Sequence, residues 1–226
     1  MNENILPSAS LFLGIVPALL LLYISLKGYE GQYKEKNIFL TFIVGIVFGV
    51  IAVLIEAVTM NAGVLFIFLF PLMEQLLKTI VLNIGRLQGK KETVIYGLSL
   101  GVGFGSIFTP FSLITTRFQG GFSFANIALI VIGSFGIILL HGATGICIGY
   151  GVYIKQLPKY VTQAILLYIP VTGFIFLTTI FQVEFLQIGI VLYSVVIYWY
   201  ITKKLMPRIL PDHRRVQRSE KRRKII

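Results

Sequence analysis

Seven long apolar stretches constrain this sequence more than any other feature. They cover residues 8–26, 38–58, 63–84, 93–116, 125–154, 160–182 and 185–202. About 17–25 apolar residues suffice for a helix to cross a lipid bilayer. Only 13% of the residues are charged, whereas soluble domains carry about 25%. The sequence therefore predicts an all-α integral membrane protein, with a seven-transmembrane-helix bundle over residues 1–202.

The lysines and arginines outside these stretches predict the orientation of the helices. The eight segments outside the membrane, from the N-terminus to the tail, carry 0, 3, 0, 3, 1, 2, 0 and 10 of them. Because Lys and Arg are retained on the cytoplasmic side, this alternation places the N-terminus outside and the C-terminus in the cytoplasm. Residues 1–10 lack the basic segment with which a cleaved signal peptide begins. We expect a multi-pass protein of the cell membrane.

Much of the net charge of +11 lies in a basic cytoplasmic tail, residues 203–226. A nucleic-acid-binding domain would instead spread its basic residues over a folded face, so we expect no nucleic acid partner. The lipid bilayer is the first expected partner. Anionic lipids would attract the tail by about 1 kcal/mol for each basic residue. The alternative is that the tail docks a cytoplasmic protein.

Glycines at helical spacing mark the fourth and fifth stretches as a packing interface. The fourth stretch has a double G-x-x-x-G pattern, Gly97, Gly101 and Gly105, and the fifth has Gly145 and Gly149. In lipid, close backbone approach at small residues provides much of the attraction between helices. We expect these glycines to serve helix packing and the fourth helix to be central.

Ionisable residues inside the membrane are costly and therefore are candidates for function. Glu74 and Lys78 lie in the third stretch with an i, i+4 spacing that puts both on one helix face. They could form a self-neutralising structural pair or belong to a site. Glu56 lies near the outer end of the second stretch and Glu184 in the outer connection between the sixth and seventh, and we expect both to be interfacial.

His141 in the fifth stretch falls at about the depth of Lys78, counted at ~1.5 Å per residue. A buried Glu can act as general base on water, and a His can hydrogen-bond a substrate carbonyl or bind a metal. Glu74 and His141 therefore are the candidate catalytic residues, with Lys78 and Gln75 in support. They are also the candidate ligands should a divalent metal be the cofactor, and the pattern leaves open whether there is one. Cys147, the only cysteine, excludes a cysteine-based metal site.

Three segments, in order, resemble the intramembrane glutamate-protease superfamily. This superfamily includes the PrsW and YhfC membrane peptidases, the CAAX prenyl-protease family and the non-catalytic Aph subunit of gamma-secretase. EQLLK (74–78) resembles the Glu-Glu-x-x-Lys helix of PrsW, YGLSLGVGFGSIF (96–108) its glycine helix, and the helix of His141 its histidine helix. GLSLG (97–101) and IILLH (137–141) are also similar to two helices of the Aph subunit.

The motifs are incomplete in this chain. Gln75 replaces the second Glu of the PrsW pair, Phe108 and Thr109 stand where that family has Glu-Asn, and 160–182 lacks the second His of the Aph pattern. The resemblance implies an intramembrane peptidase that hydrolyses a membrane protein or peptide, with Glu74 as base. The alternatives are a non-catalytic scaffold with a partner subunit, as for Aph, and a small transporter or channel. No inverted repeat supports a transporter.

Overall fold

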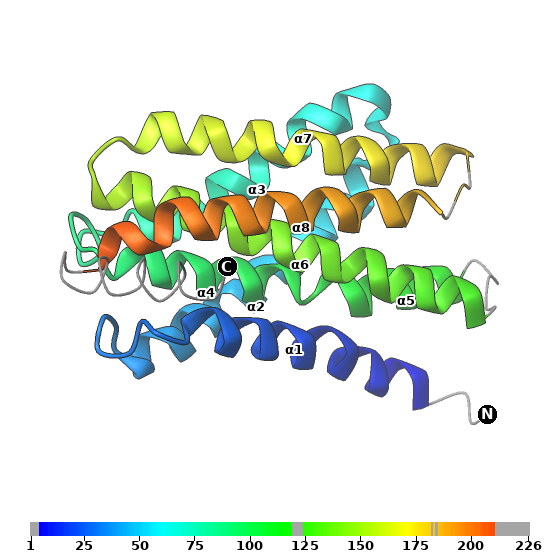
Figure 1. The fold of residues 1–226 in the computed structure, drawn as a ribbon. Helices are drawn as coiled ribbons and strands as arrows, with labels where there is room; N and C mark the ends of the chain where they lie inside the picture. The colour runs from blue at the N-terminus through cyan, green and yellow to red at the C-terminus, as the bar shows by residue number, and fades with distance from the viewer. Residues whose placement is uncertain (1–4, 119–123, 182, 184, 211–226) are drawn as a thin grey trace, which may run out of the picture.

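The computed structural model describes residues 5–118, 124–181, 183 and 185–210, and is entirely helical apart from the connections (Figure 1). Its elements are α1 (Ile5–Leu26), α2 (Glu35–Thr59), the 3₁₀ helix η1 (Met60–Leu65), α3 (Phe66–Leu82), α4 (Thr93–Gly105), α5 (Phe108–Phe118), α6 (Phe124–Tyr153), α7 (Leu157–Phe181), α8 (Leu186–Leu205) and the 3₁₀ helix η2 (Met206–Ile209). Glu184 and residues 211–226 of the predicted tail lie outside the described residues.

The helices of this bundle are long and apolar enough for a membrane protein. Six helical segments could each cross a bilayer by length and composition, and α1 adds a shorter apolar helix over Ser10–Leu26. Large apolar side chains cover the outside of the bundle; Phe12 is 70% exposed and Phe39 68%. Soluble monomers rarely expose such surfaces. The chain is therefore an all-helical, multi-pass membrane protein.

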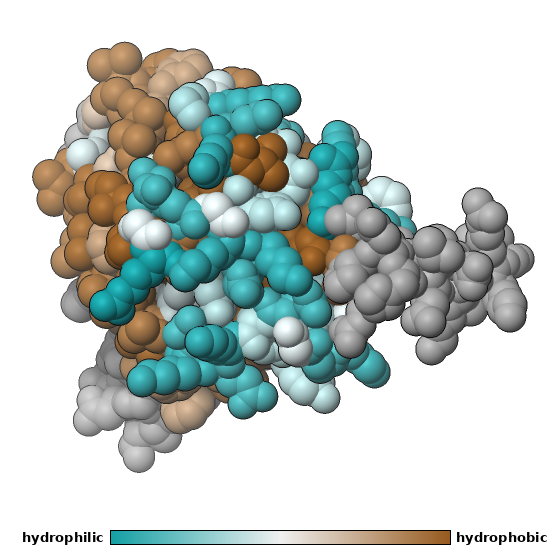
Figure 2. Space-filling view, turned by 90° about the vertical axis from the view of Figure 1, so that its left-hand side faces the viewer, coloured by the Kyte–Doolittle hydropathy of each residue, from teal (hydrophilic) through white to brown (hydrophobic). Residues whose placement is uncertain are grey.

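The polar residues gather at one end of the bundle. The connections 27–34, 83–92 and 154–156 lie at that end, together with the C-terminal end of α8 (Figure 1). Seen from there, the molecule presents a hydrophilic face with apolar flanks (Figure 2). The basic connections that alternate along the sequence therefore lie on one side of the molecule.

Helix α4 is the centre of the bundle, as the glycine pattern predicts. Every residue of α4 is buried, and it packs most extensively against α6 and α2. A Cβ atom on Gly97 would clash with the carbonyl oxygen of Gly145, and one on Gly145 with that of Gly97. Gly101 faces the carbonyl of His141 in the same way, and Gly149 faces that of Thr93. Only glycine allows backbones to approach this closely.

The apolar pattern of the fourth stretch predicts one continuous helix. In the structure this stretch forms two helices. It breaks after Gly105, and α5 begins at Phe108. Pro110 explains the break, because proline has no N–H to donate to the carbonyl four residues earlier, at Ser106. Helix α1 packs at this break: a Cβ on Gly14 would clash with the Ser106 carbonyl oxygen.

Candidate functional site

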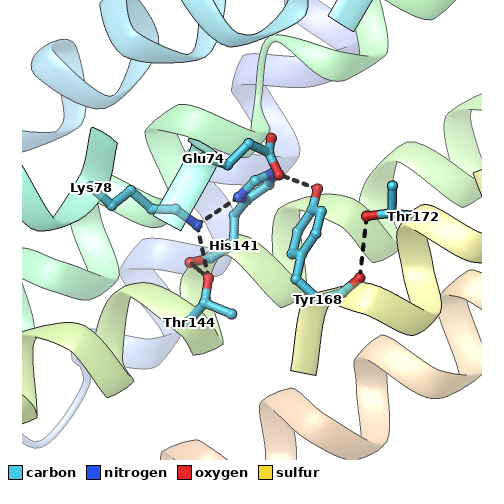
Figure 3. A network of polar contacts seen from close by, with 6 residues as sticks. All are labelled: Glu74, Lys78, His141, Thr144, Tyr168 and Thr172. Atoms are coloured by element: carbon cyan, nitrogen blue, oxygen red, sulfur yellow. Dashed lines mark hydrogen bonds and ion pairs between the residues drawn. The ribbon is translucent and has the colours of Figure 1, made fainter. Parts of the chain in front are cut away.

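Three helices bring five polar side chains together in the interior of the bundle (Figure 3). Glu74 and Lys78 come from α3, His141 and Thr144 from α6, and Tyr168 from α7. All five are fully buried. The structure thus brings together the three ionisable residues predicted from the sequence, and adds a threonine and a tyrosine. We call these five residues the buried polar cluster.

Lys78 joins α3 to α6. Its Nζ lies 2.9 Å from Nδ1 of His141 and donates to Oγ1 of Thr144 at 2.8 Å. Thr144 in turn donates to the carbonyl oxygen of His141 at 3.1 Å. Within the described part of the chain, no ion pair joins Lys78 to Glu74. Lys78 instead contacts the neighbouring helix directly, while its charge interacts with that of Glu74 without a direct contact. The self-neutralising pair therefore stays a prediction.

The other ring nitrogen of His141 faces Tyr168 and Glu74. Nε2 lies 2.9 Å from the hydroxyl oxygen of Tyr168 and 3.6 Å from Oε1 of Glu74 (Figure 3). An ammonium group can only donate, so a protonated Lys78 makes Nδ1 the acceptor and leaves the ring proton on Nε2. That proton then points toward the phenol oxygen and the carboxylate. One histidine thus connects the cation to the carboxylate.

The carboxylate of Glu74 and the side-chain amide of Gln75 have unsatisfied hydrogen-bonding capacity. Among the described residues, no hydrogen bond of normal length and angle reaches either oxygen of Glu74 or either end of the Gln75 side chain. Oε1 of Glu74 still pairs with Nε2 of His141 at 3.6 Å, and the carboxylate interacts with the Tyr168 hydroxyl. Both side chains are fully buried. Buried polar groups are nearly always paired, and exceptions often mark a functional role. Glu74 therefore retains lone pairs that can take a proton.

Aromatic rings enclose His141. The ring centroids of Phe104, Phe108 and Tyr168 lie 4.7, 5.2 and 4.9 Å from that of the imidazole. A Cβ on Gly105 would come within 3.1 Å of the imidazole Cδ2 atom, so the glycine leaves room for the ring. Phe108, which stands where the PrsW pattern has a glutamate, packs directly on the histidine. An apolar side chain therefore borders the imidazole at the position to which the PrsW pattern assigns a glutamate.

Sequence reasoning missed Thr144 and Tyr168. Thr144 follows His141 by three residues and so shares its helix face. Tyr168 and Thr172 are four residues apart on the buried face of α7, and Thr172 donates to the Tyr168 carbonyl oxygen. The sequence shows these spacings, but only the fold shows that these faces of α6 and α7 meet Glu74 and Lys78.

Glu56 lies elsewhere than the sequence predicted. We expected an interfacial carboxylate, but the structure leaves only 4% of Glu56 exposed. It interacts electrostatically with both Glu74 and Tyr168, and its Oε2 has no hydrogen-bond partner among the described residues. A second buried carboxylate therefore lies near the buried polar cluster.

A metal ion at Glu74 and His141 finds little support in this geometry. The described residues contain no group of three or more His, Cys, Asp or Glu side chains placed to hold a metal. Both nitrogens of His141 already face protein groups, Lys78 on one side and Tyr168 on the other. The arrangement fits proton transfer and hydrogen bonding better than metal ligation.

Comparisons with known proteins leave the site to be interpreted from its chemistry. No protein-family model, no curated protein and no solved structure matches the chain.

Proposed function

We propose that this chain is an intramembrane peptidase related to the glutamate-protease superfamily, with Glu74 as the general base. The observation that carries the proposal is the position of the fully buried Glu74 carboxylate, 3.6 Å from Nε2 of His141 in the interior of the bundle. A base and a hydrogen-bond donor directed at the same place are what hydrolysis of a peptide bond requires.

The proposed topology has seven spans, with α1 as the first, in the cell membrane. The N-terminus lies outside and the basic tail in the cytoplasm. Support comes from the polar connections at one end of the bundle (Figure 1) and from the preference of Lys and Arg for the cytoplasmic side. In this orientation the buried polar cluster lies within the hydrocarbon region, so the substrate is a membrane-embedded peptide segment.

In the proposed reaction, Glu74 takes a proton from a water molecule while the oxygen of that water attacks the carbonyl carbon of the substrate. The Nε2–H of His141 and the hydroxyl of Tyr168 donate to the carbonyl oxygen as it becomes negative. The C–N bond then breaks, and Glu74 returns the proton to the leaving amine. Lys78 holds His141 in the tautomer that presents Nε2–H. All atoms and protons are thus accounted for within this cluster.

Helix α3 is the element that would admit a substrate. It carries Glu74 and packs mainly on α7, with smaller contacts to α2, α4 and α6. The 3₁₀ helix η1 precedes it, with a kink at Gly63 where φ is 64°. Movement of α3 away from α6 would open the space between Glu74 and His141 without unpacking the α4–α6 interface.

A second candidate function is a non-catalytic scaffold of a membrane complex, like the Aph subunit. The observation that favours it is the complete burial of the cluster, with Phe108 packed on His141. In this alternative, the network of Lys78, His141 and Thr144 only fixes how α3 joins α6. The partner would bind elsewhere on the bundle.

One experiment separates the two functions. Cells would express the wild type, Glu74→Gln or His141→Ala, and the N-termini of membrane-protein fragments would be quantified along with co-purifying proteins. The peptidase predicts fragments that disappear in both variants. Unchanged fragments in both variants, with a partner retained by both, would instead establish the scaffold. Size-exclusion elution in detergent checks that each variant is folded.

A further inference from the structure

A second polar feature lies at the end of the bundle that carries the basic connections, away from the buried polar cluster. An open cavity of about 170 Å³ lies between the C-terminal ends of α1 and α8. Lys27 and Lys203 line it, together with the hydroxyl-bearing residues Ser25, Tyr198 and Thr202. Ser25 and Tyr198 share a hydrogen bond that joins the two helices.

The two lysines give the cavity a positive charge that the described residues do not neutralise. Both are exposed, and no ion pair joins either to an acidic side chain of the described residues. Glu30 is the acidic residue of the same connection, but it does not line the cavity, and its carboxylate accepts from the N–H of Gly28 at 2.9 Å. An anion in the cavity would thus meet two cations.

Aromatic residues place the cavity at the level of lipid headgroups. Trp199 is 55% exposed and Tyr23 73%, on the outer faces of α8 and α1. Trp and Tyr concentrate at the interface between lipid and water. Nζ of Lys203 lies 3.9 Å from the centroid of the Trp199 ring, so an exposed aromatic residue borders a cation of the cavity.

The surroundings favour a lipid over a soluble ligand. Helix α1 packs mainly on α5 and α4, and α8 on α6, and the Ser25–Tyr198 hydrogen bond beside this cavity joins α1 to α8. Ile24 beside it is 60% exposed, which provides an apolar surface for acyl chains. Small-molecule pockets measure about 300–1,000 Å³, so this cavity suits a compact headgroup.

We propose that this cavity binds the phosphate headgroup of an anionic phospholipid, with its acyl chains lying between α1 and α8. Lys27 and Lys203 contact the phosphate oxygens from the two sides. The hydroxyl groups of Tyr198 and Ser25 lie at the base. Binding ties α8 to α1 at the end of the bundle where the basic tail begins.

Trp199 is the only tryptophan in the chain, so its fluorescence reports on this place alone. The protein would be placed in phosphatidylcholine nanodiscs containing brominated phosphatidylglycerol or brominated phosphatidylcholine, and the quenching of Trp199 compared. We expect brominated phosphatidylglycerol to quench preferentially at equal mole fraction. Lys27→Gln should reduce that preference roughly fivefold, and adding Lys203→Gln should reduce it roughly fivefold again.

The control variant Lys155→Gln/Lys159→Gln removes the same charge from the α6–α7 connection and the first turn of α7, and it should keep the preference. Lys27→Gln leaves the Lys203–Trp199 contact in place, so its result does not depend on a changed probe. Equal quenching by both lipids, or equal losses in the control variant, would overturn the proposal. Inorganic phosphate that displaces the brominated lipid at millimolar concentration would overturn the choice of a lipid and identify free phosphate as the ligand.

Discussion

Nζ of Lys78 on α3 and Nδ1 of His141 on α6 lie 2.9 Å apart, and this contact determines which ring nitrogen of the imidazole is directed at Glu74. With Nδ1 occupied by a donor, the ring proton lies on Nε2, toward Tyr168 and the carboxylate. The same contact joins two helices that otherwise pack against each other only to a small extent. Lys78 is thus a positioning residue both for the fold and for the proposed chemistry.

Replacing Lys78 by Met should destabilise the protein and change the histidine tautomer. The variant leaves Nδ1 of His141 and the hydroxyl of Thr144 without their buried donor, which costs about 1–3 kcal/mol. Thermal unfolding in detergent measures the loss, and ¹⁵N NMR of labelled histidine reports the protonated nitrogen. Lys90→Met, at an exposed position, serves as the control and should change neither. A stable Lys78→Met protein with an unchanged His141 signal would contradict the network.

Tyr168→Phe should impair proteolysis far more than it impairs folding. The variant keeps the ring that packs on His141 and removes only the hydroxyl. Loss of one donor to a developing oxyanion costs about 10²–10³ in rate. Tyr193→Phe is a matched control, because the Tyr193 hydroxyl donates to the Leu167 carbonyl oxygen at 2.9 Å, outside the cluster. Equal rates for the two variants would exclude Tyr168 from the reaction.

The glycine interface between α4 and α6 makes a prediction about stability alone. Gly101→Ala drives a methyl group into the carbonyl of His141, and overpacking of this kind costs about 1–3 kcal/mol. Gly173→Ala on α7 meets no atom within 4 Å and should be neutral or stabilising, since Ala exceeds Gly in helix propensity by about 1 kcal/mol. Comparing the two unfolding midpoints isolates the effect of the interface. Equal midpoints would mean that the helices can separate without cost.

The sequence predicted where the helices of this protein lie along the chain better than it predicted which helices contact one another. Length and apolarity define a spanning segment, and most of the described residues in each of the seven stretches are helical. The break before Phe108 was also written in the sequence, as Pro110. An uninterrupted apolar pattern does not show such a break, because proline is itself compatible with an apolar stretch.

The cluster itself was only partly predictable. Counting residues from a helix end gives depth, and depth correctly placed Lys78 level with His141. It does not give the direction in which a helix face points, so Tyr168 on α7 was missed and Glu56 was assigned to the interface. Pairing of Lys78 with Glu74 looked favourable because local spacing is visible in a sequence and contacts between distant helices are not.

Cysteine labelling can test the proposed orientation, because Cys147 is buried and should give no background. A cysteine introduced at Lys90 or Lys155 lies in a basic connection, and one at Gly120 falls in the sequence between α5, which ends at Phe118, and α6, which begins at Phe124. A membrane-impermeant maleimide should label the Gly120→Cys protein in intact cells. It should label the other two only after permeabilisation. The reverse pattern would invert the topology.

The most direct test of the central claim is proteolysis by the purified protein in liposomes. Wild type and Glu74→Gln would be reconstituted with a set of single-span transmembrane peptides, and cleavage sites would be read by mass spectrometry. The account predicts cleavage within the membrane segment by the wild type. It predicts none by Glu74→Gln, although both proteins should elute alike on size exclusion. Cleavage by Glu74→Gln at the wild-type rate, or none by either protein, would contradict it.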